Sequence, residues 1–485
     1  MSQSLLKNSL FNVAYKLLNV CFPLVTSVYV ARVLLADGVG KVAYAQNIVA
    51  YFVFLAALGL PNYGVREIAK VRNDVEQTSK VFSELFAINL FSTLFFLLAY
   101  YLIVFSSPFF QNDFLLHCVV GLSLFFNIFN VTWFYQGFED FSYIMIRSFF
   151  VRIVCLIWIF ACVRTRDDVV LFACATVLAN GLTDLINMIH LRKFKIKFRL
   201  KKLNLKIHLK PLMILLSSSI AIELYTMLDT TMIGWLCDEA SVGLYTNAIK
   251  IIRILVGVVS GIAGVLLPRL SYYYSRNEID KCSELVSKVM MVMIFLYLPC
   301  QIGLLMEGDI IMPLVFGPSF EPGGLTLQIA SILICSLGFS SLFATQVLLT
   351  FGQEKKILYC TVIAAIINVL LNSILIPVFA QNGAAFASVV TEGLVTIMAY
   401  VFSRKYISVH IQKRFIFATF CSSILLFGLF LSARHFFDSY MYIFLISLFV
   451  GGVVYIAFNF LIRNPVFDSF VAILKKKRKP SRCVG

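Results

Sequence analysis

Long runs of hydrophobic residues follow one another along almost the whole chain, separated by short polar breaks. Most runs have about 20 residues, the length that an α-helix needs to cross the hydrocarbon core of a bilayer. A β-barrel would instead show short segments of alternating polarity, which the sequence lacks. The pattern predicts an all-α polytopic membrane protein with about 14 transmembrane helices. The predicted spans are 9–31, 42–60, 82–105, 115–135, 144–163, 169–191, 212–236, 245–268, 285–306, 325–350, 357–379, 383–402, 415–433 and 441–462.

Composition supports the membrane assignment and excludes a soluble enzyme. Of the 485 residues, 60% are hydrophobic and 14% are charged. Soluble domains average ~45–50% apolar and ~25% charged residues, so this chain has too little polar surface to cover a water-facing globule. The five histidines are scattered, without an HExxH motif or a carboxylate at ligand spacing. We therefore expect no metal site and no cofactor.

The net charge of +16 is unevenly distributed and predicts the orientation. Positively charged residues favour the cytoplasmic side of a membrane, and most of the 41 Lys and Arg fall in loops on one side of the predicted spans. Both termini lie on that side and are predicted to be cytoplasmic. Two basic stretches, 192–210 and 475–479, flank spans and are expected to contact anionic lipid headgroups rather than nucleic acid. The outer loops carry only Arg32, Lys41, Arg164, Arg166 and Arg434.

Two short matches indicate an internal repeat. Gly40-Lys41-Val42-Ala43-Tyr44-Ala45 after the first span resembles Gly243-Leu244-Tyr245-Thr246-Asn247-Ala248 after the seventh, 203 residues later. Gly137-Phe138-Glu139-Asp140 after the fourth span resembles Gly352-Gln353-Glu354-Lys355 after the tenth, 215 residues later. Because each copy has six spans, an even number, the copies have the same orientation in the membrane.

The repeat and the basic stretches predict the domain organisation. We expect an N-terminal lobe of six helices, a basic cytoplasmic linker, a C-terminal lobe of six helices, an added helical hairpin and a basic cytoplasmic tail. Their predicted limits are 1–191, 192–211, 212–402, 403–462 and 463–485.

Four positively charged residues lie several residues inside predicted spans: Lys16, Arg152, Lys250 and Arg253. An ionisable side chain in a span is costly and usually faces the bundle interior or a wet cavity. One interpretation is a cavity that is cationic because its cargo is anionic. The other is a structural network in which these cations pair with buried acids.

Four acidic residues lie several residues inside predicted spans: Asp184, Glu223, Asp229 and Glu392. They are the candidate partners of the cations in a structural network. If the cations instead bind cargo, the acids become candidate sites that couple transport to a proton or sodium gradient.

Other features of the spans suggest simpler roles. Lys288 and Arg147 lie near span ends and are expected to extend to the headgroups. Pro23 and Pro299 are candidate kinks. The Gly- and Pro-rich segment 308–324 is expected to form a loop on the outer side, acting as a gate or plug.

Five stretches, in order along about the first 400 residues, resemble motifs of the Wzx-type lipid-linked oligosaccharide flippases. These flippases form the polysaccharide transporter family, in the superfamily that also contains multidrug and toxin extruders and the lipid II flippase. The stretches are FPLVTSVYVARVLLADGVGKVAYAQNIVAYF (22–52, with Pro23, Arg32, Gly38 and Gly40), Arg66-Glu67-Ile68-Ala69, Trp133-Phe134-Tyr135-Gln136-Gly137, the region from Asp229 to Gly243-Leu244-Tyr245, and LNSILIPVFAQNGAAFASVVTE (371–392). The last hairpin is less similar.

The resemblance implies a fold and a function. Two six-helix lobes would form a V around a central cavity, as in the multidrug extruders, and cationic residues there would hold a diphosphate and acidic sugars. By position, Lys16, Lys250 and Arg253 are the candidates for this role. The chain would be a flippase, not an enzyme, moving polyprenyl-diphosphate-linked oligosaccharide repeats across the bacterial inner membrane by alternating access. Its expected partners are this cargo, membrane lipids, a polysaccharide polymerase and a chain-length regulator.

Two other functions are compatible with parts of the sequence. A cation-coupled multidrug extruder of the same superfamily would suit the buried acids, although a positive cavity would repel its usual cationic cargo. A membrane-embedded glycan polymerase or ligase would be expected to carry a large outer loop with Arg or His. The predicted outer loops are all short.

Overall fold

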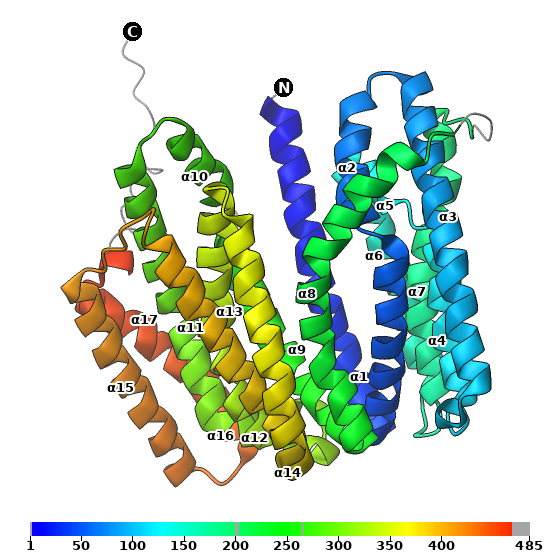
Figure 1. The fold of residues 1–485 in the computed structure, drawn as a ribbon. Coiled ribbons are helices and arrows are strands. Elements are labelled where there is room, and N and C mark those ends of the chain that lie inside the picture. Colours follow the sequence, from blue (N-terminus) through cyan, green and yellow to red (C-terminus); the bar gives the residue numbers. More distant parts are fainter. Residues whose placement is uncertain (1, 199–202, 264–265, 468–485) are drawn as a thin grey trace. The chain divides into compact units, whose positions relative to one another are not determined.

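The computed structural model describes residues 2–198, 203–263 and 266–467, and every regular element within these ranges is helical (Figure 1). The side chains of residues 2–21, 218–219, 221–222, 224–225, 260–263 and 267–268 lie outside the described part of the structure. Packing divides the chain into two units, Met1–Thr246 and Asn247–Gly485.

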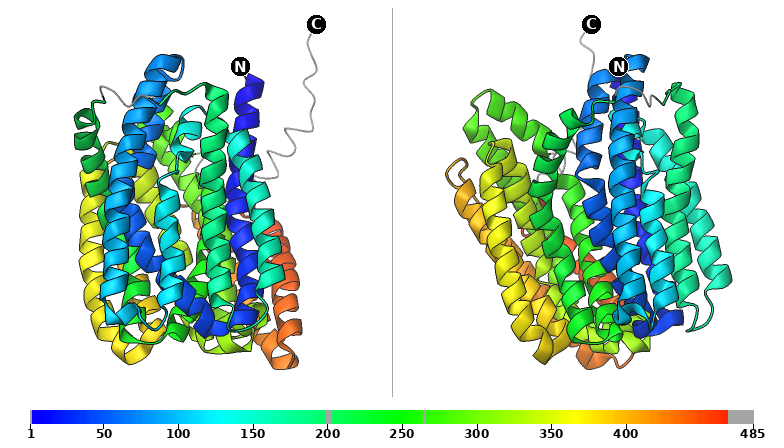
Figure 2. Two further views of the ribbon diagram at one scale, coloured as in Figure 1. Left: turned by 90° about the vertical axis from the view of Figure 1, so that its right-hand side faces the viewer. Right: turned by 45° about the vertical axis from the view of Figure 1, so that its right-hand side comes forward.

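Unit 1 contains eight α-helices, the start of a ninth and two short 3₁₀ helices. They are α1 (Ser2–Ala57), α2 (Leu60–Val71), α3 (Val75–Ser106), η1 (Pro108–Phe110), α4 (Phe114–Asn127), α5 (Thr132–Gly137), α6 (Phe141–Cys162), α7 (Val169–His190), η2 (Leu191–Phe194), α8 (Lys206–Leu236) and the first residues of α9 (Glu239–Ala263). The long helices of this unit run alongside one another in both views of Figure 2.

Unit 2 begins within α9 and contains the rest of the described chain. Its elements are α10 (Leu266–Ser275), α11 (Ile279–Phe316), the 3₁₀ helix η3 (Pro318–Gly323), α12 (Gly324–Ala330), α13 (Leu333–Ser340), the π-helix η4 (Ser341–Leu348), α14 (Glu354–Ser403), α15 (Lys413–Phe436), α16 (Tyr440–Leu445), the π-helix η5 (Ile446–Val450) and α17 (Gly451–Leu461).

The described helices confirm an all-α polytopic membrane protein. Nine are long and apolar enough to cross a membrane, and ten if the pair Pro318–Ala330 and Leu333–Leu348, bent by 47°, forms one span. Two of the nine, Phe22–Val71 and Glu354–Ser403, have 50 residues each. Fifty residues in one straight helix would measure about 75 Å at 1.5 Å per residue, more than twice the ~30 Å hydrocarbon core, and both segments are in fact broken. Glu354–Ser403 contains the predicted spans 357–379 and 383–402, whereas Phe22–Val71 contains 42–60 and the end of 9–31.

Three residues outside helical geometry interrupt the long helices. Leu35 (φ 60°) breaks α1, Ala380 (φ 48°) breaks α14 and Glu307 (φ −126°) breaks α11. The departures from helical geometry thus lie away from Pro23 and Pro299, the expected kinks. The prediction of a loop over 308–324 is wrong, because α11 continues to Phe316 and η3 follows directly. Its apolar residues let this Gly- and Pro-rich segment pack as helix.

The turns after the fourth and tenth spans have the same backbone structure. Glu139 and Gly352 both have positive φ, at 60° and 66°. In each turn the next amide, that of Asp140 or Gln353, donates to the carbonyl five residues earlier, at 3.0 and 2.8 Å. This is the Schellman ending of a helix. The equivalent residues are 352 − 139 = 213 apart, against an offset of 215 in the sequence match. The same ending also occurs at Asn277 and Arg463, so it is compatible with the predicted pairing of these turns but not specific to it.

A second pair of equivalent contacts lies at the starts of α3 and α11. The Ser79 hydroxyl oxygen accepts the amide hydrogen of Lys197 at 3.2 Å, and that of Ser283 accepts the amide hydrogen of Ser408 at 3.1 Å. The two serines are 283 − 79 = 204 residues apart, close to the predicted offset of 203. In unit 1 the segment after α7 therefore contacts the start of α3, and in unit 2 the segment after α14 contacts the start of α11.

Two of the motif stretches pack against each other in the core of unit 1. Trp133, Phe134 and Tyr135 are buried, as is Ile68. A Cβ on Gly137 would lie 2.8 Å from Cγ2 of Ile68, so only glycine permits this approach of α5 to α2. The motifs at 66–69 and 133–137 therefore contribute packing.

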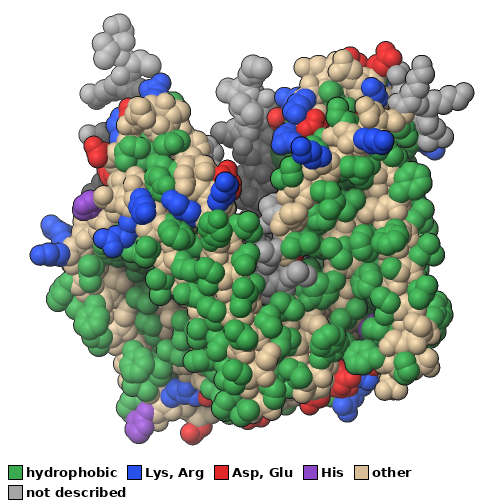
Figure 3. Space-filling model, viewed as in Figure 1, with side chains coloured by type: hydrophobic (Ala, Val, Ile, Leu, Met, Phe, Trp, Pro, Cys, Tyr) green, Lys and Arg blue, Asp and Glu red, His purple; other side chains and the backbone are tan. Residues whose placement is uncertain are grey.

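The outer surface of each unit is mainly hydrophobic along its flanks, and Lys and Arg lie towards its ends (Figure 3). This is the distribution expected for helices surrounded by lipid. The division into lobes 1–191 and 212–402, with a linker, a hairpin and a tail, remains a prediction, and the basic stretch 475–479 lies outside the described residues.

Candidate functional site

The predicted site residues are distributed over both units. Arg152, Asp184, Glu223 and Asp229 belong to unit 1, and Lys250, Arg253 and Glu392 belong to unit 2. Lys16 lies in α1, but its side chain is outside the described part.

Arg152 projects from α6 towards the first span. Its guanidinium carbon lies 5.1 Å from the ring centroid of Phe22 in α1. The side chain is half-buried. A guanidinium over an aromatic face is stabilised by the ring quadrupole, and this interaction strengthens where water is excluded. Arg152 is therefore held between α1 and α6 within unit 1.

Asp184 lies in a buried polar cluster of α6 and α7. One turn later on α7, the Asn187 side-chain oxygen accepts hydrogen bonds from Arg147 and, at 3.4 Å, from Tyr143. Arg147 is 6% exposed, so the expectation that it extends to the headgroups is wrong. Its side chain meets α7, and the hydrogen bond with Asn187 offsets its removal from water. Asp184 is itself buried and lies on the same helix as Asn187.

Asp229 is buried in α8 and accepts a hydrogen bond from the hydroxyl of Tyr245 at 2.6 Å. Two residues further along α8, the Thr231 hydroxyl contacts the Asn47 side-chain nitrogen at 2.7 Å and the Tyr51 hydroxyl at 2.8 Å. These contacts join α1, α8 and the start of α9 within unit 1. The hydrogen bond from Tyr245 gives the buried Asp229 carboxylate a polar partner within unit 1.

Glu223 lies half-buried on α8, about two turns before Asp229. Its carbonyl accepts a hydrogen bond from the Thr226 hydroxyl at 2.9 Å. The separation of six positions between Glu223 and Asp229 places the two carboxyl groups on different faces of the helix at 3.6 residues per turn. They therefore do not form a pair.

Lys250 and Arg253 follow each other by almost one turn of α9 in unit 2. The Lys250 ammonium donates to the Asn247 side-chain oxygen at 3.1 Å, and Asn247 is 1% exposed. Arg253 is exposed, and no ion pair involves it among the described residues. These two cations therefore differ: Lys250 is held by its own helix, whereas the Arg253 guanidinium is accessible.

Glu392 is half-buried in α14 and lies in the second half of that helix, beyond the break at Ala380. In the first half, the buried Asn372 amide donates to the Asn368 side-chain oxygen at 3.0 Å. The two halves correspond to the separate predicted spans 357–379 and 383–402.

One buried polar contact, near the basic linker, was not among the predicted sites. Glu84 in α3 and His208 in α8 lie 3.0 Å apart, and both are nearly inaccessible to solvent. The second imidazole nitrogen contacts the Tyr63 hydroxyl at 2.8 Å, and Glu84 also accepts the amide hydrogen of Asn204 at 2.9 Å. An acidic residue inside the third span was the available sequence signal. The contact attaches the described end of the linker to α3.

A second missed cluster lies at the break of α11. The buried Glu307 carboxylate accepts a hydrogen bond from Ser447 in η5, and Arg434 in α15 forms an ion pair with Asp309. Arg434 also donates to the carbonyl of Met306. These contacts attach the C-terminal hairpin to α11 within unit 2. The sequence signal was three charged residues close to span ends.

The described residues include no group of three or more His, Cys, Asp or Glu side chains placed to hold a metal ion. The chemistry they offer is binding: exposed or half-buried cations, buried carboxylates and aromatic rings. This repertoire suits recognition and movement of a cargo.

Comparison with known proteins gives the family. A model described as "Polysaccharide biosynthesis protein" matches residues 5–274. A protein of Escherichia coli strain K12, provisionally assigned as an O-antigen transporter, is 24% identical over 408 residues, which cover 83% of this chain and 97% of that protein.

Two solved structures are similar in fold. The lipid II flippase MurJ in an inward closed conformation has a TM-score of 0.77 and 15% identity, covering 94% of this chain and 99% of that one. A multidrug resistance transporter of the MATE family in an inward-facing conformation has a TM-score of 0.65 and 14% identity, covering 79% and 93%. The predicted resemblance is thereby confirmed. With a match over 274 − 5 + 1 = 270 of its 485 residues, the chain belongs to the polysaccharide biosynthesis protein family.

Proposed function

We propose that the protein is a flippase that moves polyprenyl-diphosphate-linked oligosaccharide repeat units from the cytoplasmic to the outer leaflet for surface polysaccharide synthesis. The observation that carries this proposal is the match to the O-antigen transporter, which extends over 97% of that relative. The family match and the MurJ-like fold agree with it. The protein acts as a transporter, not as an enzyme.

The physical problem of this transport explains the charged residues in the spans. A diphosphate cannot cross hydrocarbon unaided, and guanidinium and ammonium groups lower that barrier by charge-assisted hydrogen bonds. In the proposal, Lys16, Arg152, Lys250 and Arg253 bind the diphosphate and acidic sugars. The exposed Arg253 supports this role best, because its guanidinium is accessible in the described structure.

The acids supply the coupling in this proposal. Glu223, Asp229, Asp184 and Glu392 are the candidates to bind a proton or a sodium ion as the lobes 1–191 and 212–402 alternate. Asp229 is buried and hydrogen-bonded to Tyr245, which gives this carboxylate a defined position for binding the ion. In this proposal the protein lies in the bacterial inner membrane with both termini in the cytoplasm. Its partners on the synthetic route are a polysaccharide polymerase and a chain-length regulator.

A multidrug extruder is the alternative function. The likeness to a multidrug transporter at 14% identity concerns the fold alone. A sequence relative that covers 83% of the chain is instead provisionally assigned as an O-antigen transporter. A lipid-linked glycan is therefore the favoured cargo.

Reconstitution tests the proposal directly. Purified protein in vesicles receives a fluorescent polyprenyl-diphosphate oligosaccharide, and a membrane-impermeant quencher measures how much reaches the opposite leaflet, with and without a proton or a sodium gradient. We expect protein-dependent translocation of the glycolipid and no protein-dependent uptake of a cationic dye. Dye transport without glycolipid translocation would favour the extruder and contradict the proposal.

A further inference from the structure

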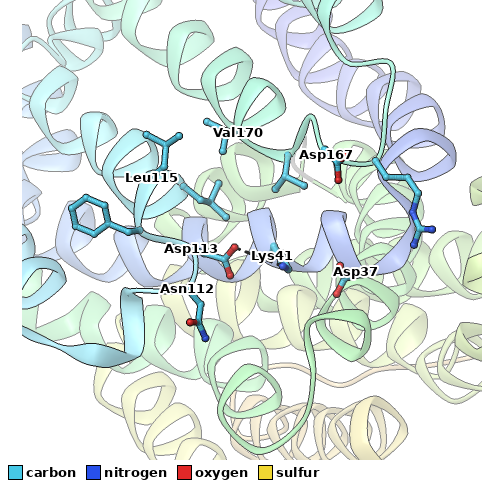
Figure 4. Close-up of a pocket in the computed structure, with 11 residues that line it drawn as sticks. Asp37, Lys41, Asn112, Asp113, Leu115, Asp167 and Val170 are labelled. Carbon is cyan, nitrogen blue, oxygen red and sulfur yellow. Dashed lines mark ion pairs between the residues drawn. The ribbon is translucent and has the colours of Figure 1, made fainter.

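A polar pocket of about 310 Å³ lies within unit 1 (Figure 4). It forms where three segments meet: the part of α1 after Leu35, the connection from η1 to α4 and the connection from α6 to α7. The Lys and Arg distribution predicts that this end of the unit faces outside. The volume falls at the lower limit of small-molecule sites, ~300–1,000 Å³. The eight predicted site residues are absent from its lining, all of which is described.

The walls of this pocket are held by the protein itself. The Tyr29 hydroxyl donates to the carbonyl of Val163 at 2.8 Å, which joins α1 to the end of α6. Asp168 accepts two backbone hydrogen bonds from the α6–α7 connection, at 2.8 and 2.7 Å. Gly38 permits close packing, since a Cβ there would lie 3.3 Å from Val169. The pocket therefore exists without a ligand to form it.

Both hydrogen-bond donors and acceptors line the pocket, and they come from all three segments. The carboxylates accept, the two cations donate and the amide does both. In Figure 4, Asp113 and Lys41 face each other, and Asp37 lies one turn before Lys41 on α1. These polar side chains are Asp37, Lys41, Asn112, Asp113, Arg166 and Asp167.

Two helix N-termini add further donors. The first turns of α4 and α7 line the pocket through Phe114 and Val169 and their neighbours. The first amide hydrogens of a helix have no partner within it. Within the described residues, neither N-cap carboxylate accepts them, because Asp113 pairs with Lys41 and Asp168 accepts from the preceding connection.

This mixture selects the class of ligand. Three carboxylates oppose a phosphate or another anion, whereas Lys41, Arg166 and the two N-termini oppose a cation. Sugar hydroxyls each donate and accept, so a neutral sugar ring satisfies both kinds of group. Phe114 and Leu115 supply an apolar edge for its C–H face.

We infer that this pocket binds a sugar residue of the translocated glycan at the outer end of unit 1. The inference rests on the proposed function, because it takes the glycan as the ligand. The Lys41–Asp113 pair, 3.7 Å apart and about one third exposed, presents a weak surface contact that sugar hydroxyls can replace.

The test measures binding to the purified full-length protein in lipid nanodiscs. The probe is the soluble repeat-unit oligosaccharide, released from its lipid by mild acid, and inorganic diphosphate is the competitor. The variants are Asp113→Asn and Asp167→Asn. Because the Asp167 side chain is exposed, we expect the Asp167→Asn protein to fold normally. Asp438→Asn, the same change at an exposed site of unit 2 between α15 and α16, is the matched control.

We expect the oligosaccharide to bind the wild type and the control equally and each pocket variant about tenfold more weakly, with no displacement by diphosphate. Equal binding to all four proteins, no binding to the wild type, or displacement by diphosphate would overturn the inference. Glycolipid translocation by the wild type is measured in parallel. If translocation occurs but the pocket variants bind normally, only this inference fails; if translocation is absent, the proposed function fails whatever the binding result.

Discussion

The imidazole of His208 in α8 lies 3.0 Å from the carboxylate of Glu84 in α3, and the two side chains are 7% and 4% exposed. The residues are 124 positions apart in the chain. Their contact fixes the first turn of α8, where the basic linker ends, against α3. Buried polar groups are costly to leave without partners, so this contact contributes to the stability of the unit.

Glu84→Ala should destabilise the protein. The change leaves the buried His208 nitrogen without its partner and removes the acceptor of the Asn204 amide, at a cost of about 2–3 kcal/mol. The free energy of unfolding in a detergent titration measures the effect. The matched control is Glu284→Ala at the equivalent start of α11, where the Glu284–Lys288 pair is more than 60% exposed and contributes at most about 1 kcal/mol. Equal losses for the two variants would contradict the buried-contact account.

Gly40→Ala should prevent normal packing of unit 1. A Cβ on Gly40 would overlap the backbone carbonyl of Glu239, and a Cβ on Gly243 would overlap that of Ala36. Backbone atoms cannot move aside as a flexible side chain does, so we expect loss of at least ~2 kcal/mol or failure to fold. The control is Gly393→Ala, where nothing lies within 4 Å of the new methyl group. The melting temperature of each purified variant measures the effect. A Gly40→Ala variant as stable as the wild type would rule out the close approach of Gly40 in α1 to Glu239 in α9.

Arg253→Glu should abolish surface polysaccharide while the protein still reaches the membrane. In the proposed mechanism the reversed charge repels the diphosphate, whereas Arg253→Lys keeps the positive charge and should retain most activity. Complementation of a strain lacking the gene, with polysaccharide measured at the cell surface, gives the readout. Lys405→Glu, an exposed cation just after α14, serves as the control. Normal polysaccharide with Arg253→Glu would exclude a cationic role for this residue.

The hydrogen bonds of Asp168, a residue outside the spans, predict that the stability of the protein depends on pH. Hydrogen bonds from the backbone amides of Arg164 and Thr165 hold the pKa of this carboxyl below its ordinary value of 3.8. A depressed folded-state pKa gives stability that is present at neutral pH and is lost as the pH falls through that pKa. Asp168→Asn should therefore lower the melting temperature at about pH 7, and the difference from wild type should shrink towards about pH 3. A difference that stays constant over this range, or a similar effect of Asp167→Asn, would argue against the backbone hydrogen bonds as its cause.

The local pattern of the sequence predicted the spans and the repeat. A run of about 20 apolar residues dictates a membrane helix wherever it lies, because each backbone polar group is satisfied within the segment. The sequence also paired the stretches 137–140 and 352–355, whose helices end in the same way, since a Schellman ending involves only neighbouring residues. Short motifs such as Trp133-Phe134-Tyr135-Gln136-Gly137 indicated the family correctly.

Tertiary structure alone decided how the polar residues are paired. Arg147 was expected at the headgroups but is buried against Asn187, and Glu84 and Glu307 were not expected to have structural partners. Helical periodicity places a residue on a face, yet which face meets which neighbour depends on the rotation and packing of helices far apart in the chain. The outer pocket has the same origin, because its polar groups come from three segments that meet only after folding. The sequence by itself therefore determined the membrane fold and the family, while the environment of each charged side chain was decided by packing.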